Sequence, residues 1–130
     1  MLKLAPGLII HTLDNKHQWM FIGYYENTKE KWKDLETGLV WYDTEDKTYN
    51  HDNAIIKFTG DKRLPSKEEW EQAEKNGIRQ VLNFERKWYW SSSVHSGYSN
   101  FAYVFNGRDG YIDFDARVYD VYSVRCVAAR

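Results

Sequence analysis

Short runs of apolar and aromatic residues, separated by turn-forming residues, fill the first third of the chain. Residues 7–11 and 19–25 are rich in β-branched and aromatic side chains, which is typical of strands. Residues 14–16 between them predict a turn, and residues 37–42 predict a turn followed by another strand. The charged stretch 26–36 lacks these features and predicts an exposed loop or a short helix.

A first helix is predicted near the middle of the chain. Ala54, Ile55 and Phe58 have the spacing of one helical face, which indicates a short helix over about residues 50–58. The His–Asp pair at residues 51–52 lies at its start, where Asp is a common capping or first-turn residue. A ligand role for this pair is the alternative.

A second helix has a clearer signal. Ser66 and Glu69 have the spacing of a capping box, in which each side chain accepts from the other residue's backbone N–H. Trp70 and Ala73 follow on one face of the helix. Gly77 supplies the left-handed residue that ends it.

Strand and turn signals alternate over the remaining residues. A bridge at 80–86 leads to strands at 88–90, 101–106, 111–115 and 121–127, with a glycine-containing turn at 106–110. Two helices followed by hairpin strands indicate an α+β fold. We expect one domain over residues 1–130, with N-terminal strands to residue 35, a scaffold to residue 90 and a distinct region after it.

The alternation at residues 111–115 places Ile112 and Phe114 on one face of a strand and the three residues between and beside them on the other. We expect the inward residues to belong to a fixed core together with the scaffold tryptophans. The expected core residues are Trp41, Trp70, Trp88, Trp90, Ile112, Phe114, Val124 and Val127, with Cys126 as a small buried hydrophobe.

Composition excludes several classes of function. A net charge of −1 gives no support for bulk binding of nucleic acid or an anionic membrane. The single Cys126 rules out an internal disulfide and a cysteine-cluster metal site. No apolar run is long enough for membrane insertion, and the N-terminus lacks the features of a signal peptide. We expect no cofactor.

The C-terminal region, residues 91–130, differs sharply from the rest of the chain. It contains no Lys, Glu, Gln, Met or Trp, whereas the first ninety residues contain 31 residues of these five types. Exposed strand faces normally use Lys and Glu. A sheet that happens to lack long side chains is the plainer explanation, but the break is sharp enough to indicate another cause.

The genetic code supplies such a cause. These five amino acids are encoded only by codons that end in a purine. A codon AAC or AAT randomised at its two adenines reaches none of them, but it reaches Asn, Tyr, Ser, Asp, His, Gly, Arg, Val, Phe and Ala. Those types dominate the C-terminal region.

Several motifs together resemble C-type lectin-fold domains of the formylglycine-generating-enzyme type. These motifs are Thr-Gly-Leu-Val-Trp at 37–41, Arg-Leu-Pro-Ser-Lys-Glu-Glu-Trp at 63–70, Tyr-Trp-Ser-Ser-Ser at 89–93 and Val-Arg-Cys-Val at 124–127. The resemblance covers about residues 35–130 and implies a C-type lectin-like fold. Within that group, the missing codons resemble the variable proteins of diversity-generating retroelements.

That resemblance implies a function. In such proteins a reverse transcriptase that mutates adenines rewrites the 3′ end of the gene, and the fold displays the rewritten positions as a ligand-binding surface. Many are displayed on viral tail-fibre tips or on cell surfaces, and the small size is most similar to viral or archaeal members. The implied partner is a protein or glycan on a target surface, and tail-fibre tips are often trimers, which suggests a homo-oligomer.

The predicted ligand-binding positions are those of restricted-codon type that point away from the expected core. They are Val94, His95, Ser96, Tyr98, Ser99, Asn100, Phe101, Tyr103, Asn106, Arg108, Tyr111, Asp113, Asp115, Arg117, Tyr119, Asp120 and Tyr122. Rigid aromatics and short polar groups are typical of adaptable protein-binding surfaces.

Other chemistries have weaker support. The histidines form no zinc-binding pattern, and the serines at 91–93 lack a nucleophile-elbow frame, so we expect no enzyme and read these serines as partners of loop backbone. The paired cysteines of sulfatase-activating enzymes and the calcium tripeptides of animal lectins are missing. Asp109, Asp113, Asp115 and Asp120 could supply oxygens to Ca²⁺, but solvated or turn aspartates explain them better.

Two other functions stay open. One is a lectin-like adhesin of fixed specificity that binds a glycan. The other is an assembly subunit in which the C-terminal region packs against a partner chain.

Overall fold

The computed structural model describes residues 3–129, and this part of the chain forms eight strands and three helices. The strands are β1 (Ile9–His11), β2 (Gln18–Tyr25), β3 (Lys29–Asp34), β4 (Leu39–Tyr42), β5 (Trp88–Val94), β6 (Phe101–Asn106), β7 (Ile112–Ala116) and β8 (Val127–Ala129). The helices are α1 (His51–Lys57), α2 (Lys67–Lys75) and α3 (Ile78–Val81). None of these helices is long and apolar enough to cross a membrane.

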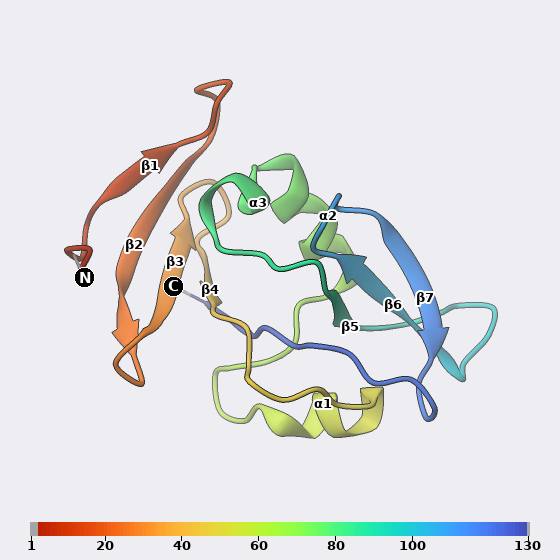
Figure 1. Cartoon of the computed structure of the whole chain (residues 1–130). Helices are drawn as coiled ribbons and strands as arrows, with labels where there is room; N and C mark the ends of the chain where they lie inside the picture. The colour runs from red at the N-terminus through yellow and green to blue at the C-terminus, as the bar shows by residue number, and fades with distance from the viewer. Residues whose placement is uncertain (1–2, 130) are drawn as a thin grey trace.

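The strands form two antiparallel sheets. One has the order β1-β2-β3-β4-β8 and the other the order β5-β6-β7. Figure 1 shows the larger sheet on the left, the smaller sheet on the right, α2 and α3 at the top between them, and α1 below. The predicted α+β class is confirmed.

Trp70 of α2 joins the two sheets. Its ring stacks on Phe105 of β6 with 4.3 Å between centroids and lies 4.8 Å from the ring of Trp41 in β4. A second cluster covers the other face of the small sheet, where Trp90 and Val104 pack with neighbours from α1 and from the chain before β8. The small sheet is therefore fixed by packing on both faces, and its exposed residues stand on a rigid support.

The caps of the first two helices follow from their sequences. Ser66 Oγ accepts from Glu69 N at 3.1 Å, and Glu69 Oε1 accepts from Ser66 N at 2.8 Å, which confirms the predicted capping box. Gly77 follows α2 with a φ of 85° in the left-handed region, as predicted. The first helix is confirmed to within a residue, with Asn50 as its cap and Asp52 in its first turn.

The prediction for residues 26–36 is wrong, because this stretch contains β3. Lys29–Asp34 pairs with β2 on one side and with β4 on the other. Trp32 and Asp34 are buried, whereas Lys31 and Lys33, which alternate with them, are only partly buried. One apolar residue in the inward register is enough here, because two neighbouring strands supply the backbone hydrogen bonds.

Three smaller predictions also change. Residues 80–86 are not all an irregular bridge to the next strand. The first two belong to the third helix, α3, in which Ile78 is buried. The closing strand starts at Val127 and not at 121, since Tyr122 and Ser123 make only single bridges. Trp88 is only half-buried.

Apart from Trp88, the expected core is confirmed with one exception. Trp41, Trp70, Trp90, Val124 and Val127 are fully buried, and Ile112 packs against the core. Cys126 is 3% exposed, and burial raises the pKa of its thiol to about 12, as suits a small core residue. The expectation for Phe114 is wrong, because its side chain is 38% exposed. At Phe114, the face of β7 that also carries Ile112 is no longer covered by the core and is open to solvent.

Candidate ligand-binding surface

None of the seventeen predicted positions is buried. Val94, Ser96, Tyr98, Ser99, Asn100, Arg108, Tyr111, Asp113 and Tyr119 are exposed, and His95, Phe101, Tyr103, Asn106, Asp115, Arg117, Asp120 and Tyr122 are half-buried. The core residues that alternate with them, such as Ala102 and Val104, are fully buried. Burial therefore separates the predicted binding positions of the C-terminal region from the buried positions that alternate with them.

Five ring side chains meet on one face of the small sheet, and we call them the aromatic patch: His95, Tyr98, Phe101, Tyr103 and Phe114. The His95 ring stacks on Tyr103 with 5.3 Å between centroids and meets Phe114 edge-on at 4.5 Å. Phe101 lies 5.8 Å from Phe114 and 6.2 Å from Tyr98. Such aromatic pairs hold one another in place and present a large contact area at low entropic cost.

Strand register explains why these rings meet. Tyr103 of β6 lies directly opposite Phe114 of β7, and side chains on one strand share a face at every second residue. The loop after β5 then folds back, because His95 N donates to Phe101 O at 2.8 Å and Phe101 N donates to Tyr98 O at 2.9 Å. These bonds place the imidazole over the sheet.

The same face enters the core at its other end. Phe105 and Ile112, the next pair in register on this face, pack against the central cluster. Lys67 at the start of α2 marks the border, with Nζ 5.0 Å from the centre of the Tyr103 ring. The aromatic patch is thus the exposed end of a face that is packed elsewhere.

Arg117 ties the edge of this surface to the scaffold. Its Nε donates to Nδ1 of His51 at 3.1 Å, and its Nη2 donates to Asp52 Oδ1 at 2.7 Å. Its Nη1 donates to the Ser99 carbonyl at 3.0 Å. Arg117 therefore positions the loop before β6 and the turn after β7, in addition to any contact with a ligand.

The bonds of His51 define its protonation state. His51 is 1% exposed, and its Nε2 lies 2.8 Å from the Ser91 carbonyl, to which it donates. Because Nδ1 accepts from Arg117, the imidazole is neutral with its proton on Nε2. Burial lowers the pKa of His51, and the positive charge of Arg117 lowers it further.

Four other predicted positions take part in local hydrogen bonds through their side chains. Tyr122 donates to Asp115 Oδ2 at 2.6 Å, and burial together with this carboxylate raises the pKa of the phenol. Asp120 Oδ2 accepts from Ala116 N at 3.1 Å, and Asn106 Oδ1 accepts from Arg108 N at 2.9 Å. These side chains shape the backbone of the surface.

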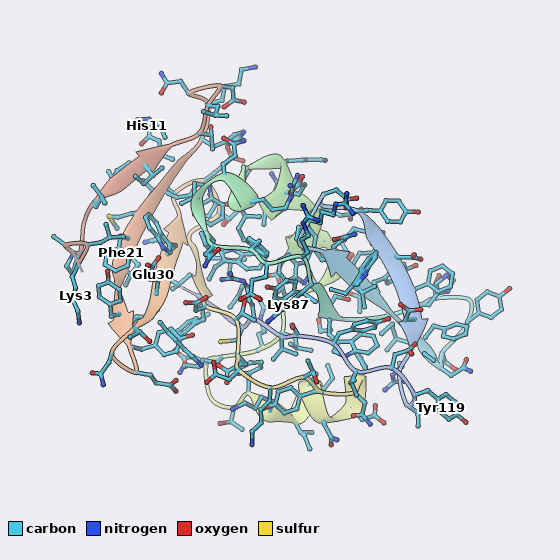
Figure 2. All side chains as sticks on the ribbon, in the orientation of Figure 1. Lys3, His11, Phe21, Glu30, Lys87 and Tyr119 are labelled. Atoms are coloured by element: carbon cyan, nitrogen blue, oxygen red, sulfur yellow. The ribbon has the colours of Figure 1, made fainter. Side chains whose placement is uncertain are left out.

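Three exposed tyrosines make no such hydrogen bond with their hydroxyls within residues 3–129. Tyr98, Tyr111 and Tyr119 are 59%, 61% and 87% exposed, and their hydroxyls make no hydrogen bond with residues 3–129. Figure 2 shows Tyr119 pointing away from the body at the end of the molecule that carries the turn after β7. These three side chains are the most available for contact with a ligand.

The seventeen positions do not form one compact patch. Asn106, Arg108 and Tyr111 lie at the β6–β7 turn, where Arg79 Nη1 donates to the Arg108 carbonyl at 3.0 Å. The six residues of β6 separate this turn from Phe101 by roughly 17 Å at the usual rise per residue. The surface therefore has a main area around the aromatic patch and a second area at the turn.

The alternative chemistries gain no support from the geometry. Among residues 3–129, no group of three or more His, Cys, Asp or Glu side chains could hold a metal ion. Asp109 and Asp113 accept from nearby backbone N–H groups, as Asp115 and Asp120 accept from their own neighbours. Ser91 Oγ donates to the Tyr103 carbonyl, and Ser93 Oγ accepts from Lys67 N, so these serines partner backbone as expected.

Sequence reasoning missed two members of this surface. Phe114 was assigned to the core by its alternation with Ile112, although Phe is itself a type that the restricted codons reach. Lys67 lies in the scaffold, and no sequence signal placed it beside Tyr103. Comparison with protein-family models, with curated proteins and with solved structures finds no match.

Proposed function

We propose that this chain is a ligand-binding module whose C-terminal surface is diversified by retroelement mutagenesis and displayed on a virion or a cell surface. Two observations together carry the proposal. Side-chain types with restricted codons fill the C-terminal region, and the seventeen outward positions among them are all at least partly accessible.

A C-type lectin-like fold is part of the proposal. In its support, β8 returns to pair with β4, so the end of the chain closes the sheet that the N-terminal strands begin. Two helices lie at the predicted positions, and a separate three-stranded sheet carries part of the restricted-codon region. In such a fold the buried residues of both sheets and the helices stay constant while the outward positions of the C-terminal region change.

Buried and accessible positions alternate within single strands, and the two kinds of position tolerate change differently. In β6, Ala102 and Val104 are fully buried, whereas Phe101 and Tyr103 next to them are accessible. A close-packed core tolerates few replacements, but exposed positions tolerate most. Random change at the largely solvated positions, such as Tyr111 and Tyr119, therefore alters what the surface binds and leaves the fold intact.

The ligand we propose is a protein surface. The accessible side chains are mainly tyrosines, short polar groups and the aromatic patch, which is the composition of adaptable protein-binding sites. A glycan is the alternative ligand, because exposed rings also pack against sugars. We propose no catalytic role.

A display library tests this function directly. The seventeen positions are randomised with codons that end in C or T, and the library is selected for binding to an unrelated protein. A control library randomises the same number of exposed positions among residues 3–87.

We expect folded binders from the first library, with their changes gathered near the aromatic patch or the β6–β7 turn. A first library that is mostly unfolded, or one that yields no more binders than the control, contradicts the proposal.

A further inference from the structure

The turn after β7, residues 117–121, presents three apolar side chains to solvent. Val118, Tyr119 and Val121 are between 57% and 87% exposed. Figure 1 shows this turn beside α1 at the edge of the molecule, and Figure 2 shows Tyr119 pointing away from it. The two valines are not among the seventeen predicted positions. Apolar side chains that are exposed together mark an interaction site, whereas isolated ones are common on any surface.

Hydrogen bonds on both sides fix the backbone of this turn. Asp120 N donates to the Ala116 carbonyl at 3.2 Å, which closes the turn itself. At its start, the Arg117 carbonyl accepts from His51 N at 3.0 Å. Just beyond its end, the backbone of Tyr122 exchanges two bonds of 2.9 Å with the residue two positions before α1. The apolar side chains therefore stand on a backbone that binding does not have to order.

The outer edge of β7 is largely closed to another strand. The pairing with β6 leaves the N–H groups of Ile112, Phe114 and Ala116 on that edge. Asp113 Oδ1 accepts from Phe114 N at 2.8 Å, and Asp120 Oδ2 accepts from Ala116 N at 3.1 Å. Two of the three donors are thus occupied, and an edge without free donors does not add a strand. Recognition at this end of the molecule therefore falls to side chains.

Three carboxylates make the surroundings of the turn negative. Asp113, Asp115 and Asp120 form no ion pair with residues 3–129. The pKa of the Tyr122 phenol is raised by burial, by its bond to Asp115 and by all three charges, so these carboxylates lie near one another. The guanidinium of Arg117 is already paired with a carboxylate of α1. Such a surface repels anionic lipid and attracts a positively charged protein surface.

We infer that the turn after β7 docks into an apolar cleft bordered by lysine or arginine side chains on a partner protein. Tyr119 enters the cleft, because tyrosine supplies a large contact area at low entropic cost, and Val118 and Val121 cover its walls. The three carboxylates pair with basic groups at the rim. This inference rests on the proposed function, since it names the partner chemistry for one part of the proposed ligand-binding surface.

Three matched peptides separate the apolar contribution from the charge. One peptide combines Leu with Lys, the second combines Leu with Glu, and the third combines Ser with Lys, in the same order and length. Each is titrated into the ¹⁵N-labelled whole chain at pH 7.5, and the backbone amide signals of residues 117–121 are followed by NMR. We expect the Leu–Lys peptide to shift these signals saturably, with a dissociation constant on the order of 100 μM.

The other probes should bind more weakly. The Leu–Glu peptide should lose about ten-fold in affinity, because it meets like charges, and the Ser–Lys peptide about as much, because it has no apolar side chains. Vesicles of phosphatidylcholine and phosphatidylglycerol should leave the signals unchanged. Equal affinity for any two of the peptides overturns the inference. So do the absence of a response, a response confined to the aromatic patch, and binding to the vesicles.

A pair of apolar variants locates the site. Tyr119→Ser removes the proposed anchor from a largely solvated position and should weaken binding of the Leu–Lys peptide about ten-fold. Leu13→Ser removes a similarly exposed apolar side chain near the N-terminus and should leave binding unchanged. Equal affinity of these two variants for the peptide contradicts the site.

A pair of charge variants tests the rim. Asp113→Asn removes one charge but keeps an oxygen for Phe114 N, and it should weaken the Leu–Lys peptide about three-fold. Asp61→Asn makes the same change at an exposed position outside the C-terminal region and should have no effect. No difference between the two contradicts the charge pairing.

The peptide titration and the display library give separate answers. Folded binders from the library, without any response of residues 117–121 to the Leu–Lys peptide, overturn this inference alone. A peptide response at the turn, together with a library that yields no more binders than its control, overturns the proposed function alone.

Discussion

Arg117 Nε donates to Nδ1 of the buried His51 at 3.1 Å, so a residue of the C-terminal region is held by a residue of the scaffold. The same imidazole donates from Nε2 to the Ser91 carbonyl. One histidine therefore links α1, the strand β5 and the turn after β7. This link bears on how the proposed surface responds to acid and to mutation.

Acid should weaken the fold through His51. Its pKa is lowered in the folded chain, first by burial and then by Arg117. The neutral form is therefore favoured by folding, and its contribution is complete above the unfolded value of about 6.5. It is lost progressively as the pH falls below that value.

Urea unfolding at pH 7.5 and pH 5.5 measures this effect. His51→Gln keeps a polar side chain that cannot titrate, and it should lose less stability on acidification than the unmodified chain. His11→Gln changes an exposed histidine on β1, which Figure 2 shows away from the small sheet, and it serves as the control. If His51→Gln and the unmodified chain lose the same stability, the imidazole is not the responsible group.

Replacing Arg117 should cost more than replacing another arginine of the same region. Arg117→Ala leaves His51 Nδ1 and the Ser99 carbonyl without their donor, and we expect a loss of about 1–2 kcal/mol in the free energy of unfolding. Arg108→Ala removes an exposed side chain without hydrogen bonds to residues 3–129 and should change stability by less than about 0.5 kcal/mol. Similar losses for the two variants, measured by denaturant unfolding, would show that the network contributes nothing.

The accessible aromatics should tolerate the changes that restricted codons produce. Tyr111→Asn and Tyr119→Asn should each alter the free energy of unfolding by less than about 0.5 kcal/mol, because both rings are largely solvated. Phe105→Ala, in the same region but stacked on Trp70, should cost about 3–5 kcal/mol. Thermal melting followed by circular dichroism distinguishes the two classes. A large loss at Tyr111 or Tyr119 would mean that these rings pack against something, such as another copy of the chain.

The capping box should contribute measurably to stability. Ser66→Ala removes the acceptor for Glu69 N and should cost about 1 kcal/mol. Ser96→Ala, at an exposed loop position, should be neutral within about 0.5 kcal/mol. The comparison of their urea midpoints checks the difference, and equal midpoints would contradict the importance of the cap.

Local signals were sufficient where the determining residues lie close together in sequence. Ser66, Glu69 and Gly77 define α2 within a dozen residues, and all three act as their spacing indicates. The burial of Trp41, Trp70 and Trp90 also followed from the segments that hold them.

Distant contacts decided the cases that sequence reasoning missed. Lys29–Asp34 becomes a strand because two neighbours pair with it, although its own residues are mostly charged. Phe114 shares its face with Ile112, but whether that face is covered depends on where α2 begins, and Phe114 lies beyond that point among His95 and Phe101. The bond from Arg117 to His51 joins residues 66 positions apart. No periodicity along the chain reports such a contact.

The coding DNA, with a few kilobases on either side, tests the central claim most directly. Diversification by a retroelement predicts a nearby near-copy of the 3′ coding sequence that differs from it only where the copy has adenine. Those adenine positions should fall in the codons of the accessible residues around the aromatic patch and the β6–β7 turn, and not in the codons of Val104 or Phe105. The absence of any such copy, or differences spread evenly over synonymous sites, would contradict the account.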